Sequence, residues 1–188
     1  MADQLYLSLW LRDFTADNML RRFGKLLETF PFSKLRPGLA SLSVYALEFV
    51  EPPLLVQTYT EATDVETVLQ TAAEFRNADC AYLVEGWWEL WQFDGEWHLH
   101  PARASFECHG PEFASDLGDH LRIGLGPDAW FLPQPGIPGS GITIQSNMKS
   151  LLRLIQDLSD ALPVASRRLW LESGEDFSAR LAAKMDTE

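Results

Sequence analysis

The chain is poor in cysteine and contains no long apolar run. Its 188 residues include two cysteines, Cys80 and Cys108, which lie far apart and match no metal-binding or redox spacing. Unpaired thiols are typical of reducing compartments, so we expect a cytoplasmic protein. No stretch approaches the roughly 18 apolar residues of a membrane span, and the first residues lack the basic segment of a signal peptide. We therefore expect no membrane association.

Basic residues are scarce in the middle third of the chain. Residues 51–120 contain two Lys or Arg and fourteen Asp or Glu, which accounts for the whole net charge of −12. Because carboxylates repel phosphate backbones, this composition argues against nucleic-acid binding. It suits a basic protein partner or a cationic ligand, although a solubilising surface is an equally simple explanation.

Common catalytic and metal-binding motifs are also missing. The chain has no Gly-x-Ser-x-Gly nucleophile elbow and no Walker phosphate loop. His98-x-His100 with Cys108-His109 downstream resembles a ligand set, but strand geometry separates His98 from His109 by about 13 Å and turns Cys108 to the opposite face. We predict no catalytic residue, no metal and no cofactor, and a non-enzymatic protein is favoured.

Hydrophobic periodicity predicts an α+β fold. Alternating apolar residues over 5–11, 39–49, 54–59 and 81–93 indicate strands, and helical spacing follows Thr15 and the capping box Thr63–Glu66. The resulting βαββαβ order is that of a ferredoxin-like unit, and a Trp-rich antiparallel meander is expected to extend its sheet. A C-terminal helix-strand-helix, over about 146–162, 167–171 and 176–185, is expected to close the fold.

We expect one domain, residues 1–188, made of two interlocking halves. Residues 1–93 form the βαββαβ half, and residues 94–188 hold the rest of the meander, a Gly/Pro-rich loop over 126–141 and the closing elements. Eight of the sixteen loop residues are Gly or Pro. The apolar side chains of Trp130 and Phe131 favour a packed loop over a linker.

The segment from Trp87 to His100 has the most informative pattern, with four of the seven tryptophans. Asp94-Gly95 predicts a two-residue type I′ hairpin turn, and a second turn is expected at Pro101-Ala102. This register places one apolar set on a single face, which we expect to be core. The set comprises Trp88, Leu90, Trp97, Leu99, Ala104, Phe106 and Cys108.

The opposite face of this meander is the candidate ligand surface. The register predicts three cross-strand rows: Glu89–His100–Arg103, Trp91–His98–Ser105 and Phe93–Glu96–Glu107. Aromatic rings beside carboxylates and imidazoles suit sugars or cationic ligands. In the alternative interpretation, the C-terminal helix or the Trp130-Phe131 loop covers the rings and the charges form an ordinary ion network. The predicted binding residues are Trp87, Glu89, Trp91, His98, His100, Arg103 and Glu107.

Three functional hypotheses follow. The first is an interaction protein whose acidic middle third engages a basic protein partner. The second is a small-molecule binding domain that uses the aromatic and polar face of residues 82–109. The third and weakest is an enzyme. The sequence leaves the oligomeric state open.

Overall fold

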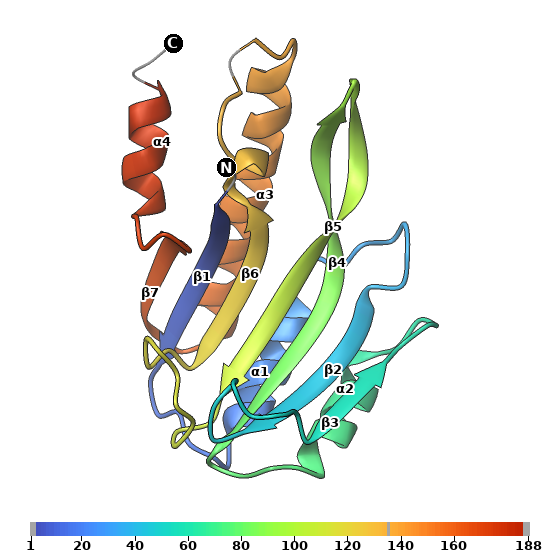
Figure 1. The fold of residues 1–188 in the computed structure, drawn as a ribbon, viewed down its shortest axis with the longest axis vertical. Coiled ribbons are helices and arrows are strands. Elements are labelled where there is room, and N and C mark those ends of the chain that lie inside the picture. Colours follow the sequence, from blue (N-terminus) through green and yellow to red (C-terminus); the bar gives the residue numbers. More distant parts are fainter. Residues whose placement is uncertain (1–2, 135, 186–188) are drawn as a thin grey trace.

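The computed structural model describes residues 3–134 and 136–185 of the chain, with one antiparallel sheet and helices packed on it (Figure 1). Within these residues no helix is long and apolar enough to cross a membrane. The strands are β1 (Gln4–Leu11), β2 (Leu39–Ala46), β3 (Leu55–Thr58), β4 (Cys80–Asp94), β5 (Glu96–His109), β6 (Leu121–Pro127) and β7 (Val164–Leu171). The helices are α1 (Met19–Thr29), α2 (Val65–Ala73), α3 (Ser140–Ala161), α4 (Phe177–Met185) and a 3₁₀ turn, η1 (Asp128–Trp130).

The seven strands have the order β3-β2-β4-β5-β6-β1-β7, and every neighbouring pair is antiparallel. Figure 1 shows α1, α2 and α3 behind this sheet, so that one face is covered by helices and the other is not. We refer to the second face as the open face.

The core lies between the sheet and the helices. Four leucines of β1 alternate with Tyr6, Ser8 and Trp10 and are buried, as the alternation predicts. The apolar stripe of α1 meets them from the helical side. The fully buried apolar side chains from these two elements are Leu5, Leu7, Leu9, Met19, Phe23, Leu26 and Leu27.

Helix boundaries differ slightly from those predicted. The N-cap of α2 is Asp64, whose carboxylate accepts a hydrogen bond from the Thr67 amide, so the capping residue lies one position after Thr63. Helix α3 begins at Ser140 instead of Ser146, directly after Gly139, which has a φ of 76°. The C-terminal helix-strand-helix of the prediction is present as α3, β7 and α4.

A ferredoxin-like start is not confirmed, although the elements follow in the order βαββαβ. Such a unit would hold its first strand within the sheet formed by its own half. Instead, β1 lies between β6 and β7, which both come from the second half of the chain. The sheet is also much larger than a four-stranded unit.

The predicted turn at Pro101-Ala102 is wrong. Strand β5 runs without interruption from Glu96 to His109, and Pro101 pairs with Glu89 of β4. On its other side β5 pairs with β6 only from Ser105 to Cys108. At Pro101, β5 is therefore an edge strand, where a residue without an amide hydrogen is tolerated.

The predicted hairpin register is wrong by one residue. Asp94 pairs with Glu96 and Phe93 with Trp97, leaving Gly95 alone at the tip. A type I′ turn needs positive φ at two residues, but Gly95 has a φ of 76° and Asp94 is not left-handed. Because the side-chain period of a strand is two, this slip moves Trp97 and Leu99 off the face of Trp88.

Candidate functional site

The open face carries polar and aromatic side chains from adjacent strands. Register pairs place Ser105 of β5 beside Gly124 of β6, and Gly124 beside Tyr6 of β1. One step further along the same strands, Glu107 lies beside Arg122, and Arg122 beside Ser8. These two rows have different surroundings: the first lines an open groove and the second is buried.

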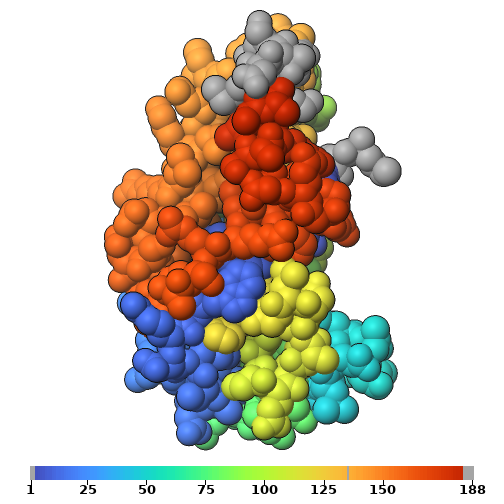
Figure 2. Space-filling model, turned by 90° about the vertical axis from the view of Figure 1, so that its left-hand side faces the viewer, coloured from blue at the N-terminus to red at the C-terminus, as the bar shows by residue number. Residues whose placement is uncertain are grey.

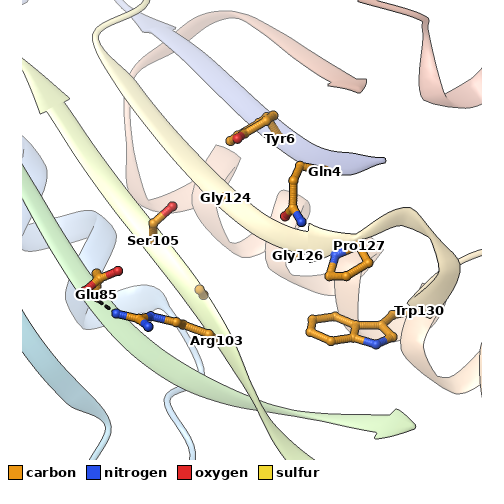
Figure 3. A pocket seen from close by; sticks show the side chains of 10 residues that line it. Gln4, Tyr6, Glu85, Arg103, Ser105, Gly124, Gly126, Pro127 and Trp130 are labelled. Atoms are coloured by element: carbon orange, nitrogen blue, oxygen red, sulfur yellow. Dashed lines mark hydrogen bonds and ion pairs between the residues drawn. The ribbon is translucent and has the colours of Figure 1, made fainter. Parts of the chain in front are cut away.

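The groove has a volume of about 300 Å³, which is at the lower limit for a small-molecule pocket. Figure 3 shows Ser105 and Tyr6 on opposite sides of Gly124, with Trp130 near one end and the Arg103–Glu85 pair near the other side. The lining residues come from β1, β4, β5, β6 and η1. They are Gln4, Tyr6, Glu85, Arg103, Ala104, Ser105, Gly124, Gly126, Pro127 and Trp130.

Two glycines of β6 allow side chains to lie close to its backbone. A Cβ atom at Gly124 would come within 2.3 Å of the Ser105 hydroxyl oxygen, and one at Gly126 within 2.2 Å of the Trp130 ring. Gly126 also has a φ of 90°, a conformation that strongly favours glycine. The Gly-x-Gly sequence of β6 therefore places the indole of Trp130 directly against the strand.

Several polar groups of the groove have no partner within the described residues. Four groups form no hydrogen bond to another described residue: the side-chain amide of Gln4, the hydroxyls of Tyr6 and Ser105, and the indole nitrogen of Trp130. Burial, with the nearby carboxylates of Glu172 and Glu107, raises the pKa of Tyr6, so its hydroxyl stays neutral. These groups are free to donate to, or accept from, a ligand.

The charges of the groove are already paired with one another. The Arg103 guanidinium donates to the Glu85 carboxylate over 2.5 Å, and the Ser41 hydroxyl donates to the same carboxylate over 2.9 Å. Arg103 remains 59% exposed in this ion pair. The groove therefore offers a neutral charge pair, neutral hydrogen-bonding groups and an aromatic wall.

The second row of the open face is a closed charge cluster. The Asp119 carboxylate, fully buried, accepts hydrogen bonds from Ser8 over 2.6 Å and from both Nε and a terminal nitrogen of Arg122 over 2.8 Å. His109 lies between the Asp119 main-chain carbonyl, 2.8 Å from Nδ1, and the Glu107 carboxylate, 3.0 Å from Nε2.

The charged state of this cluster follows from its hydrogen bonds. Burial alone would lower the pKa of His109, but the hydrogen bonds to Asp119 and Glu107 raise it to about 9. Burial would raise the pKa of Asp119, but His109, Arg122 and Ser8 hold it well below its usual range. The His109 imidazolium and the Arg122 guanidinium are therefore paired with ionised carboxylates.

The loop between β5 and β6 seals this cluster from solvent. It supplies Asp116 and Asp119, and the amide of His120 bonds to the carbonyl of Leu9. Figure 2 shows this yellow loop at the surface beside the blue N-terminal segment. Over residues 3–134 and 136–185, no group of three or more His, Cys, Asp or Glu side chains is arranged to hold a metal ion.

The predicted ligand face is only partly brought together. Trp87 and Arg103 are cross-strand partners, and the Arg36 guanidinium lies 3.7 Å from the Trp87 ring centre. Glu89 instead supports the chain before β2, where it accepts hydrogen bonds from the Ser33 hydroxyl and the Lys34 amide. These contacts lower its pKa.

The predicted cross-strand rows are wrong as well. His98 pairs with Gln92 and His100 with Leu90, so the two imidazoles share the face of Leu90 and not that of Arg103. Trp91 pairs with Leu99. Of the seven predicted residues, Arg103 lines the groove and Glu107 belongs to the closed cluster.

Helix α3 and the loop before it contact part of the meander. The side chain of Asn147 in α3 bonds to both the amide and the carbonyl of Trp91, and also to the carbonyl of Trp130. The Trp97 indole donates to the Pro138 carbonyl over 2.7 Å. The Gly/Pro-rich loop and α3 thus pack on the hairpin, as its apolar residues predicted.

Six groove residues lie outside the meander and were not predicted from the sequence: Gln4, Tyr6, Gly124, Gly126, Pro127 and Trp130. One usable signal was the alternation in β1, which turns Tyr6 away from the leucine face. The other was the Gly-x-Gly of β6 inside a strand, which indicates close approach to its backbone.

Comparison with known proteins adds no functional information. No family model matches the chain, and no curated protein or solved structure is significantly similar to it.

Proposed function

We propose that this protein binds a small, neutral, polyhydroxylated ligand, such as a sugar, in the groove on the open face. The observation that carries the proposal is a contrast between neighbouring rows: the polar groups of one are paired within the protein, and those of the other are open to solvent. The closed cluster around Asp119 uses its hydrogen-bonding capacity internally, whereas the groove leaves Gln4, Tyr6 and Ser105 unpaired. Unused donors and acceptors around a concave aromatic site are what a polar ligand requires.

The charge balance of the groove supports a neutral ligand. Arg103 and Glu85 neutralise each other, and the raised pKa of Tyr6 keeps its hydroxyl uncharged. The indole of Trp130 supplies a flat apolar surface for the C–H face of a sugar ring. A cationic ligand would compete with Arg103 for Glu85, so it is the less favoured form of this hypothesis.

The acidic-partner hypothesis has less support. Eight of the fourteen carboxylates in residues 51–120 are hydrogen-bonded within the protein: Asp64, Glu66, Asp79, Glu85, Glu89, Glu107, Asp116 and Asp119. Among the exposed carboxylates, Asp94 and Glu96 lie at the hairpin tip and Glu61, Glu66 and Glu74 lie in or beside α2, at opposite ends of the molecule in Figure 1. A single basic partner would have to span that length to engage both groups.

Isothermal titration calorimetry with a panel of neutral mono- and disaccharides, inositol and choline tests the proposal. We expect saturable one-to-one binding of at least one neutral polyol, in the millimolar range or tighter. Arg103→Ala and Ser105→Ala each remove a lining polar group and should weaken this binding about five-fold or more.

The matched control is Arg153→Ala, because Arg153 is 84% exposed on α3, in the helical layer. It should leave the affinity unchanged. The absence of polyol binding up to about 10 mM, or equal losses in Arg103→Ala and Arg153→Ala, would contradict the proposal. Binding of choline alone would contradict the neutral-ligand assignment.

A further inference from the structure

A second concave site lies in the helical layer, away from the open face. It is a crevice of about 450 Å³ where α1 meets α2 and the end of α3. Its lining residues on α1 are Arg21, Arg22, Gly24, Lys25 and Glu28, and its other walls are Leu69 of α2 and Ala161 of α3.

The crevice is cationic in a protein with a net charge of −12. Three of its lining side chains are basic and Glu28 is the one acidic side chain that lines it. That carboxylate lies 3.8 Å from the ammonium of Lys25, a loose pair with both side chains more than half exposed. The crevice therefore keeps an excess of positive charge.

The two arginines of the crevice have no acceptor. Within residues 3–134 and 136–185, neither guanidinium forms a hydrogen bond or an ion pair. The Nε of Arg22 is buried and unpaired, which is uncommon because buried polar groups are nearly always hydrogen-bonded. An oxygen-rich anion would supply the missing acceptors.

The floor of the crevice is apolar and tightly built. A Cβ atom at Gly24 would come within 2.5 Å of a methyl group of Leu69, so the glycine lets α1 approach α2 closely. Leu69 and Ala161 then present hydrocarbon beside the cations. A ligand that fits both surfaces has an anionic head and a small apolar body.

We infer that this crevice binds an organic phosphate. Two guanidiniums and an ammonium match the charge and the several acceptor oxygens of a phosphate ester, and arginine forks are suited to bidentate contact with phosphate. The apolar floor accommodates the organic group. The inference is independent of the polyol proposal, because the two sites share no lining residue.

Calorimetric titration with phenyl phosphate, inorganic phosphate and benzoate tests this inference. We expect one-to-one binding of phenyl phosphate that is tighter than that of the other two compounds. It should weaken when sodium chloride is raised from 50 to 300 mM, a change that shortens the Debye length about 2.4-fold. The double variant Arg21→Ala/Arg22→Ala should lose affinity at least ten-fold. Arg21→Ala alone changes an exposed residue and should lose affinity several-fold in a folded protein.

Two control variants assign the result to the crevice. Arg153→Ala removes an exposed arginine of the same helical layer, and Arg103→Ala removes the groove arginine; both should bind phenyl phosphate as the wild type does. The inference is overturned if phenyl phosphate does not saturate, if Arg21→Ala binds it as tightly as Arg153→Ala does, or if benzoate binds equally well.

Discussion

The two rows of the open face lie on the same three strands but differ in what surrounds them. At one end, Glu107, Arg122 and Ser8 are joined by Asp119 and His109 under the β5–β6 loop, and each polar group finds a partner. At the other end, Ser105, Gly124 and Tyr6 lie under no such loop. The charged residues of the first end are therefore occupied by one another, whereas the polar groups of the second end remain available to a ligand.

Removal of Asp119 is expected to have the largest effect on stability. Asp119→Ala removes the buried carboxylate that accepts two hydrogen bonds from Arg122 and lies 3.4 Å from Nδ1 of His109, and loss of one partner of a buried ion pair costs about 3–5 kcal/mol. Urea denaturation measures the change. Asp157→Ala is the matched control, because Asp157 is half exposed and 3.8 Å from Arg153, and its removal should cost at most about 1 kcal/mol. Equal costs would show that the cluster is not a buried network.

The stability of the closed cluster should depend on pH through His109. Its pKa in the folded protein is about 9, above the unfolded value of 6.5, so its stabilisation is complete below pH 6.5 and is lost as pH rises through 9. The loss is about 3 kcal/mol at most. Denaturation of the wild type and of His109→Gln at pH 6.5, 8 and 9.5 measures it. The variant should lack this part of the decline, and identical slopes in the two proteins would refute the assignment.

The close fit of Trp130 on β6 distinguishes the groove from an ordinary strand surface. Gly126→Ala and Gly174→Ala both place a methyl group at a φ near 90°, but only the first meets a side chain, the Trp130 ring at 2.2 Å. The first variant should therefore be less stable than the second by about 1–3 kcal/mol, the usual cost of overpacking. Thermal unfolding compares the two. No difference between them would mean that Trp130 moves away from β6 at little cost.

The smallest effect is expected at Arg103. Because its ion pair with Glu85 is largely solvated, Arg103→Ala should change the free energy of unfolding by no more than about 1 kcal/mol. This variant therefore separates binding from folding, which Asp119→Ala does not. If urea denaturation showed that the free energy of unfolding falls by several kcal/mol, Arg103 would belong to a buried network like the closed cluster.

The parts of the fold set by local pattern could be predicted from the sequence. The leucine alternation of β1, the apolar stripe of α1 and the closing helix-strand-helix are all present. The position of β1 between β6 and β7 could not be predicted, because long-range pairing is chosen by packing that no local pattern encodes.

The candidate site was harder to predict because it depends on register. A turn with one left-handed residue, Gly95, instead of two shifted every pairing in the hairpin by one position. Arg103 lines the groove, whereas the two histidines lie on the other face of the hairpin. The Asp119 cluster draws on residues more than one hundred positions apart, so spacing alone could not reveal it.

Backbone amide chemical-shift mapping during titration with the best neutral polyol tests the central claim most directly. We expect the amide chemical shifts around Tyr6, Ser105 and Gly124 to change together and to saturate with one affinity. The amide chemical shifts around the Asp119 cluster and the Arg22 crevice should not change. Shifts confined to any other surface, or none in the presence of saturating polyol, would contradict the assignment of the groove as a ligand site.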